Sequence, residues 1–246
     1  MALMGKRVLI TGGGTGLGAV LALRFADEGC AVVIAGRNAD ALARVAERHP
    51  SIRAIAADVT DEAAVTALFA GAGPCDIVIA NAGAALSKPL VKTELAEWEQ
   101  MIGVNLTGVF LTFREGLRQM PDWGRLIAVA STAGLKGYPY VAPYVSAKHG
   151  VVGMVKALAL EVARKPVTVN ALCPGFLDTE MTDRSVANIA ATTGRSLDEA
   201  RTTLARVNPQ GRLIDPAEVA AAALWLCQAG SDAVNGQAIA ISGGEV

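Results

Sequence analysis

A short apolar run leads straight into a glycine-rich turn in the stretch Arg7-Val8-Leu9-Ile10-Thr11-Gly12-Gly13-Gly14-Thr15-Gly16-Leu17-Gly18. The branched residues of 7–10 are typical of a buried strand. Apolar residues then recur at helical spacing between Leu17 and Glu28. The sequence therefore predicts a strand, a tight turn and a helix, in that order.

The same alternation of short apolar runs and helical stretches continues along the chain. We expect further strands at 31–35, 52–56, 76–80, 125–130, 167–172 and 238–241, and helices at 40–48, 62–69, 95–120, 144–164 and 216–228. Strands that are apolar on both faces and separated by helices are typical of a parallel sheet between helix layers. We therefore predict one α/β domain over 1–246, a doubly wound Rossmann fold with about seven parallel strands.

One long segment, 179–213, does not follow this alternation. It is polar and rich in Thr and Arg, and only 197–207 has the period of a short helix. Compact domains rarely carry insertions this long unless they serve as lids or binding loops. We expect a mobile substrate lid here, with scattered apolar side chains that close over an acyl chain: Met181, Val186, Ile189 and Leu204.

Composition narrows the class of protein. The chain is 52% apolar and 18% charged, which excludes disorder. A net charge of −1 and 4% aromatic residues make nucleic acid an unsuitable ligand. The longest apolar run, 219–227, is far below the ~20 residues that cross a bilayer, so we expect no membrane partner.

The cysteine pattern and the start of the first strand indicate in which cellular compartment the protein works. No Cys-x-x-Cys pair occurs, and His49 and His149 lack metal-ligand spacing, so we expect no metal site. Residues 6–10 enter a strand without the layout of a signal peptide. We expect a reduced cytoplasmic protein that buries its four cysteines, Cys30, Cys75, Cys173 and Cys227.

The glycine turn predicts a dinucleotide site. Glycines allow a tight turn and let backbone N–H groups approach a diphosphate, which the helix N-terminus also favours. An ordinary strand–helix turn is the alternative, but the strand before and the helix after are the context that the motif requires. The expected contacts from this turn are Gly12, Thr15, Gly16, Leu17 and Gly18.

The end of the second strand indicates which dinucleotide binds. An acidic residue that would bind the ribose hydroxyls of NAD is missing at Gly36, and Arg37 stands beside it. A guanidinium suits a 2′-phosphate, so we favour NADP over NAD. Alternatively, Arg37 is a solvated residue at a helix start with Asn38 as the N-cap, and the glycine turn adds no second basic residue.

Polar turns end the next two predicted strands. Asp58 and Val59 are placed to meet the adenine, and the turn Asn81-Ala82-Gly83 lies where open α/β sheets bind ligands. Either could be simple turn chemistry. Their occurrence at successive strand ends favours a shared site.

A candidate catalytic set follows the fifth strand. Tyr144 and Lys148 are four residues apart, so they share one helix face, and an ammonium there favours the phenolate. Ser131 at the strand end could hydrogen-bond a substrate carbonyl. The alternatives are a surface Tyr packing over a Lys stem, or Tyr138 or Tyr140 as the useful phenol.

Together these motifs resemble the short-chain dehydrogenase/reductase family over essentially the whole chain. The glycine turn, Asn81-Ala-Gly, Asn105, Ser131, Tyr144-x-x-x-Lys148 and Pro174-Gly175 stand in the family's order. One departure is Ala80, where the family often has a second Asn.

The resemblance implies a role for each matched residue. Tyr144 would be the general acid or base, Lys148 would lower its pKa and bind the nicotinamide ribose, and Ser131 would orient the carbonyl. Asn105 would hold a water on a proton relay, unless it is a helix-interior Asn that bonds to the backbone. The nicotinamide would be bordered by Pro174, Gly175, Leu177 and Thr179. Gly236-Gln237 resembles the family's subunit-contact end, usually in a homotetramer.

Within the family, 142–153 and 172–176 look most like 3-oxoacyl thioester reductases, including polyketide ketoreductases. NADPH-dependent reduction of a 3-oxoacyl thioester is the leading hypothesis. The alternatives are a dehydrogenase of a cyclic, secondary or sugar alcohol, and a nucleotide-sensing binding protein without turnover. Four cations would frame a phosphopantetheine or CoA phosphate, or are scattered surface charges: Lys88, Lys92, Arg184 and Arg195.

Overall fold

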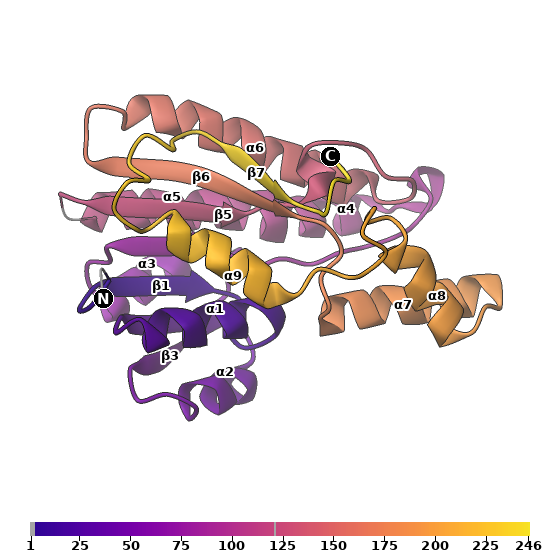
Figure 1. Ribbon diagram of the computed structural model, residues 1–246, viewed down its shortest axis with the longest axis horizontal. Coiled ribbons are helices and arrows are strands. Elements are labelled where there is room, and N and C mark those ends of the chain that lie inside the picture. Colours follow the sequence, from indigo (N-terminus) through magenta and orange to yellow (C-terminus); the bar gives the residue numbers. More distant parts are fainter. Residues whose placement is uncertain (1–2, 121) are drawn as a thin grey trace.

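The computed structural model describes residues 3–120 and 122–246. Within them, strands form one parallel sheet in the order β3-β2-β1-β4-β5-β6-β7 (Figure 1). The strands are β1 (Arg7–Thr11), β2 (Ala31–Gly36), β3 (Ile52–Ala56), β4 (Ile77–Ala80), β5 (Gly124–Val129), β6 (Val167–Pro174) and β7 (Ala238–Ile241). The predicted doubly wound parallel sheet is confirmed, and β1 and β4 flank the point where the strand order reverses.

Helices cover both faces of the sheet. On one face, α1 (Gly16–Asp27), α2 (Ala39–Ala46) and α9 (Pro216–Trp225) contribute to one apolar core. On the other, α3 (Glu62–Ala72), α5 (Gly108–Gln119) and α6 (Ala142–Glu161) contribute to a second core. Neighbouring residues of β1 alternate between them, Val8 and Ile10 in the first and Leu9 in the second. This alternation explains why the central strands are apolar on both faces.

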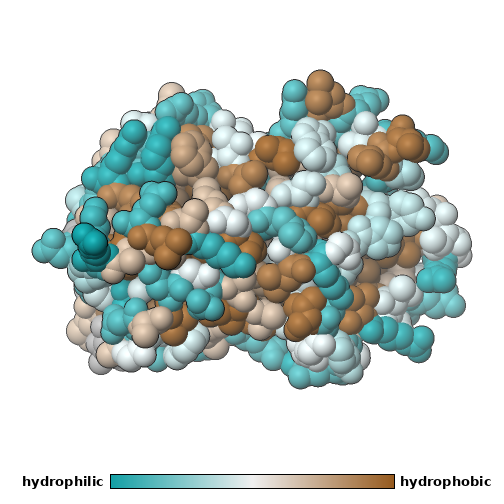
Figure 2. Space-filling view, turned by 90° about the horizontal axis from the view of Figure 1, so that it is seen from above, coloured by the Kyte–Doolittle hydropathy of each residue, from teal (hydrophilic) through white to brown (hydrophobic). Residues whose placement is uncertain are grey.

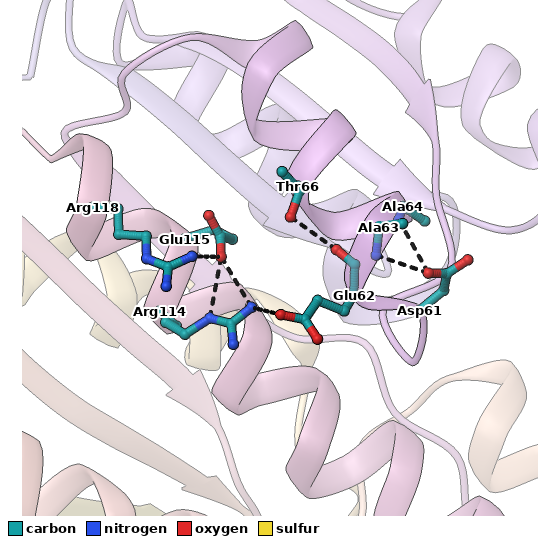
Figure 3. A network of polar contacts seen from close by, with 8 residues as sticks. All are labelled: Asp61, Glu62, Ala63, Ala64, Thr66, Arg114, Glu115 and Arg118. Atoms are coloured by element: carbon teal, nitrogen blue, oxygen red, sulfur yellow. Dashed lines mark hydrogen bonds and ion pairs between the residues drawn. The ribbon is translucent and has the colours of Figure 1, made fainter.

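Polar contacts tie α3 to α5 at the rim of the second core. The Arg114 guanidinium bridges the two helices, donating to Glu62 at 2.6 Å and to the buried Glu115 (Figure 3). Arg118 donates to the same Glu115 oxygen at 2.7 Å. The Asp61 side chain accepts from the first N–H groups of α3 and so caps that helix.

The expected helix over 95–120 is confirmed, with one irregularity that the sequence did not predict. The structure has α4 (Leu95–Ile102), a π-helical turn (Gly103–Thr107) and then α5. Gly108 lets the chain pass close to the end of β3, because a Cβ there would lie 2.8 Å from a Val59 methyl. The Asn105 side chain bonds outward to the backbone of Ala84. Both contacts fix the chain where the helix period changes, and π turns are frequent at functional sites.

The segment 179–213 is more regular than expected. It forms a helical hairpin of α7 (Glu180–Thr193) and α8 (Leu197–Ala205), of which only α8 was predicted. Val186, Ala200 and Leu204 form a small core of its own, with Ile189 packed against it. Two of the side chains expected to be free for an acyl chain, Val186 and Leu204, are therefore already buried between the helices. Figure 1 shows the hairpin beyond the carboxyl ends of the strands.

Among the described residues, no helix combines the length and apolar character needed to cross a membrane.

Candidate active site

The glycine turn is packed against the end of β4. Gly12 has φ +67°, a conformation that side chains rarely adopt, and a Cβ at Gly18 would lie 2.1 Å from the Gly12 carbonyl oxygen. The Asn81 side chain donates to the carbonyls of Thr11 and Gly12 at 3.0 and 3.2 Å. Asn81 thus holds the turn that opens α1, whose N-terminus suits a diphosphate. This cradle fits a dinucleotide.

The ends of β2 and β3 border a cavity of about 270 Å³ that also reaches Gly83. Arg37 lies at its rim, 74% exposed, with its guanidinium 4.0 Å from the Asp58 carboxylate. Asp58 accepts from the backbone N–H and the hydroxyl of Thr60, and these bonds and Arg37 lower its pKa. Asn38 accepts from the Ala41 N–H and is the N-cap of α2. The cavity therefore brings Arg37, Asp58 and Gly83 together.

Ser131, Tyr144 and Lys148 meet beside the end of β5. Ser131 follows the strand, accepts from the Ala133 N–H at 3.1 Å and lies close enough to the Tyr144 phenol to lower its pKa. The Lys148 ammonium lies 5.6 Å from the centre of the Tyr144 ring and donates to the Val129 carbonyl at 2.8 Å. The expected i, i+4 face of α6 brings these groups to one place.

Burial shifts the pKa values of Lys148 and Tyr144. The Lys148 side chain is buried, and burial lowers its pKa to about 8. Burial raises the pKa of Tyr144, while the Ser131 hydroxyl acts in the opposite direction. The phenol is therefore protonated at neutral pH and able to donate, and the ammonium is held without a carboxylate partner among the described residues.

Asn105 is buried in the π turn behind the site. Its amide donates to the carbonyls of Ala84 and Met101, and its oxygen accepts from the Ala84 N–H. A Cβ at Gly83 would lie 2.9 Å from the Asn105 oxygen and 3.9 Å from the Lys148 nitrogen. Asn105 therefore bonds to the backbone, as the alternative expected, and also lies next to Lys148.

The segment after β6 closes the site. Pro174 ends β6, and Leu177 pairs with Ile214 in a short parallel bridge that anchors the base of the hairpin. Thr179 precedes α7 and faces the glycine turn, since a Cβ at Gly16 would lie 3.5 Å from its side chain. The structure thus brings the two expected cofactor segments within contact distance.

Sequence reasoning missed a polar group on the other side of Ser131. Thr132 and Tyr138 share a hydrogen bond of 2.6 Å, and the Tyr138 phenol also bonds to the Glu245 carboxylate. Lys136 pairs with the same carboxylate at 3.0 Å. Glu245 is 107 positions from Tyr138, and no motif signals the contact.

Two of the four cations expected to frame a phosphate are held by other side chains. Lys88 is held by Glu97 at 2.8 Å, and Arg195 contacts Thr203 in the hairpin. All four cysteines are buried and free, and burial raises the pKa of Cys173 to about 11. Among the described residues, no three His, Cys, Asp or Glu side chains gather as a metal site would require.

The sequence profile described as short chain dehydrogenase matches residues 6–190. The chain belongs to the short-chain dehydrogenase family. It is 37% identical over 223 residues to a 3beta-hydroxysteroid dehydrogenase of Mediterraneibacter gnavus, covering 87% of this chain and 76% of that protein. It is 32% identical to the 3-oxoacyl-[acyl-carrier-protein] reductase of Aquifex aeolicus, covering 98% of each chain.

A solved member of the short-chain dehydrogenase family has the same architecture. A variant of the actinorhodin polyketide ketoreductase, crystallised with NADPH, superposes with a TM-score of 0.92 at 32% identity and covers 98% of this chain and 97% of its own. As a short-chain dehydrogenase, this chain is an oxidoreductase acting on CH–OH groups with NAD(P). Its fold and its site geometry fit that chemistry.

Proposed function

We propose that this enzyme reduces a 3-oxoacyl thioester with NADPH, using Ser131, Tyr144 and Lys148. The observation that carries the proposal is the meeting of a protonated phenol, a serine hydroxyl and a buried ammonium at the end of β5. NADPH would supply the hydride. The protein residues supply the proton and the polarisation of the carbonyl.

Each residue has a distinct part in the proton transfer. Tyr144 donates its phenolic proton to the carbonyl oxygen as that oxygen gains charge. The Lys148 ammonium stabilises the phenolate that remains, and its place beside Gly83 suits contact with the nicotinamide ribose. Ser131 donates a hydrogen bond that orients the carbonyl. Asn105 positions Ala84 and borders Lys148, where a water would carry the replacement proton.

The cofactor would lie along the carboxyl ends of the strands. Its diphosphate would meet Gly12, Thr15, Gly16, Leu17 and Gly18, and its adenine would meet Asp58 and Val59. The nicotinamide half would meet Asn81, Ala82, Gly83, Pro174, Gly175, Leu177 and Thr179. Arg37 favours NADP, because it is exposed at the cavity rim and Gly36 offers no carboxylate to repel a 2′-phosphate. The solved relative with NADPH supports the same choice.

The proposal of a thioester substrate rests on similarity to a 3-oxoacyl reductase and to a polyketide ketoreductase. This similarity extends along almost the whole chain. A second candidate is oxidation of a cyclic secondary alcohol, favoured by the 37% identity to a hydroxysteroid dehydrogenase. A nucleotide sensor without turnover would not need the complete catalytic set, so this alternative has least support.

A substrate screen tests the proposal. The enzyme is mixed with 3-oxoacyl thioesters, cyclic ketones and secondary alcohols, with NADPH or NADH and their oxidised forms, and the reduced-nicotinamide absorbance is followed. We expect the fastest turnover with a thioester and NADPH. Faster turnover of a cyclic alcohol would favour the second candidate, and cofactor binding without turnover of any substrate would favour the sensor.

We also propose that the enzyme is a cytoplasmic homotetramer. Figure 2 shows apolar side chains among polar ones on the face that it presents. Large apolar side chains remain exposed before and on α4, on α5 and on α6, namely Leu90, Val91, Leu95, Phe110 and Leu160. Exposed apolar residues on adjacent helices favour burial against other subunits.

A further inference from the structure

The polar group beyond Ser131 forms one connected wall, which we call the polar wall: Thr132, Lys136, Tyr138 and Glu245. The Glu245 side chain is 2% exposed. Because an ionised carboxylate only accepts, Tyr138 donates to Glu245 and Thr132 donates to Tyr138. Lys136 completes the wall by pairing with the carboxylate at 3.0 Å and contacting the Glu245 backbone carbonyl at 3.4 Å.

Three observations place this wall beside the site. Thr132 directly follows Ser131 in the chain. Burial and the hydrogen bond to Glu245 raise the pKa of Tyr138, and Tyr144 lies close enough to add to that shift. The second Glu245 oxygen, Oε2, lies 3.1 Å from where a Cβ at Gly175 would stand. The wall therefore extends from the carbonyl-binding serine to the segment proposed to border the nicotinamide.

The wall also reaches the helical hairpin. The Tyr138 ring packs edge-on against Phe176, with ring centres 6.3 Å apart, and Phe176 contacts the small core of α7 and α8. The wall therefore connects the segment after Ser131 to the base of the hairpin.

A purely structural role does not explain Glu245 well. Its Oε2 is buried and has no hydrogen-bond donor among the described residues. A buried polar atom without a hydrogen-bond partner lowers the stability of the fold by about 1–3 kcal/mol. An apolar side chain would avoid that cost, so a carboxylate at this position needs another explanation.

The charge is explained by Lys136. Without Glu245, the partly exposed Lys136 ammonium, 5.1 Å from the centre of the Tyr138 ring, would stand beside the site as an unpaired cation. Such a cation attracts a carboxylate over several ångströms in a half-buried site. With Glu245 in place, Lys136 and Tyr138 both point to its carboxylate and the wall has no net charge.

We propose that Glu245 is a specificity-determining residue that neutralises Lys136, so that the site takes neutral carbonyl substrates (esters, thioesters and cyclic ketones) in preference to free oxo acids. The inference rests on the proposed function, because it concerns the carbonyl substrate of the same site. It adds that the carboxyl group of an oxoacyl substrate must be esterified.

The test compares matched neutral and anionic ketones. One pair is ethyl acetoacetate and acetoacetate, and the other is methyl 3-oxocyclohexanecarboxylate and its free acid. For each pair, kcat/KM is measured with NADPH and the affinity is measured by calorimetry in the presence of oxidised cofactor, so that the comparison does not depend on turnover. The wild type should prefer each ester.

Glu245→Gln keeps the size of the side chain and an oxygen for Tyr138 but removes the charge. We expect the ester-to-acid ratio to fall at least about tenfold, with an absolute gain for the acids, because Lys136 is freed. Adding Lys136→Gln should return the ratio to within about threefold of the wild type. The matched control Glu62→Gln removes a carboxylate from the Arg114 ion pair between α3 and α5 and should leave the ratio unchanged.

An unchanged ratio in Glu245→Gln, a shift that persists in the double variant, or a wild type that prefers the acids would each overturn the proposal. If Glu245→Gln fails to fold, Lys136→Gln alone decides, since it leaves the carboxylate unpaired and must raise the ratio. Reduction of the cyclic ester but of no open-chain oxoacyl compound would contradict the proposed substrate, while the cyclic pair would still decide the role of Glu245.

Discussion

At the scale of single residues, burial shifts the pKa values of Tyr144 and Lys148 in opposite directions. Burial makes the Tyr144 phenol a weaker acid and the Lys148 ammonium a stronger one, so at neutral pH the phenol is protonated while the ammonium is still charged but close to its pKa. A bound oxidised nicotinamide would add positive charge and favour the phenolate. We therefore expect Tyr144 to lose its proton only when cofactor is bound in the site.

Replacing the phenol tests this assignment. Tyr144→Phe should abolish turnover and leave cofactor affinity close to that of the wild type, because only the hydroxyl is lost. Tyr138→Phe is the matched control: its hydroxyl is committed to Glu245 and Thr132, so substantial turnover should remain. Steady-state kinetics and fluorescence titration with NADPH measure both quantities. Near-normal rates in Tyr144→Phe, with loss in Tyr138→Phe, would mean that the wrong phenol was assigned.

The cofactor preference is also decided by a pair of residues. Gly36→Asp with Arg37→Ala adds a ribose-binding carboxylate and removes the cation proposed to hold the 2′-phosphate. Loss of an Arg–phosphate contact costs about 1.5–3 kcal/mol, so kcat/KM with NADPH should fall ~10–100-fold while that with NADH rises. A wild-type enzyme that already prefers NADH would refute the assignment to Arg37.

The lowered pKa of Lys148 predicts how stability changes with pH. Below about pH 8 the lysine is protonated in both folded and unfolded chains, and the cost of burying its charge is fully present. Between pH 8 and the ordinary lysine pKa of 10.5 the folded state loses the proton first, so the free energy of unfolding should rise by up to about 3 kcal/mol. Urea denaturation of cofactor-free wild type and Lys148→Met across this range measures the difference. A flat difference would show that Lys148 is not desolvated.

At the scale of elements, sequence periodicity predicted the strands of the sheet and the helices that pack on its two apolar faces. The strands and α1, α6 and α9 lie within a few residues of their expected bounds, because both faces of the sheet are apolar. The π turn between α4 and α5 was missed, since it depends on contacts of Gly108 and Asn105 with distant segments. Helix α7 was missed because its apolar face packs on a small core with α8, Phe176 and Leu213, and few apolar residues are needed to cover it.

The hairpin of α7 and α8 is expected to move as a unit. Its core is its own, and Arg201 ties α8 to Asp183 and to Asp178 at the base. We predict fast amide exchange at residues 181–207 in the cofactor-free enzyme and protection when cofactor and substrate bind together, because closure excludes water from the reacting groups. Hydrogen-exchange mass spectrometry decides it, with α6 as the internal reference. Strong and equal protection in both states would indicate a rigid arm instead of a lid.

At the scale of the whole molecule, the topology gathers the candidate residues. The carboxyl ends of β1 to β6 meet at one edge of the sheet, and the reversal of strand order between β1 and β4 opens the crevice where doubly wound sheets bind ligands. The sequence predicted the residues at these strand ends because each lies next to its own strand. It could not predict Glu245, whose contacts with Lys136 and Tyr138 arise only when β7 returns beside β6.

The most direct test of the central claim follows the hydride itself. NADPH deuterated at both C4 positions is incubated with an acetoacetyl thioester of N-acetylcysteamine, and the product is analysed by mass spectrometry. We predict a 3-hydroxybutyryl thioester carrying one deuterium at C3 with the wild type, and none with Tyr144→Phe. Absence of the labelled hydroxy thioester with the wild type, at a cofactor concentration that saturates binding, would contradict the account.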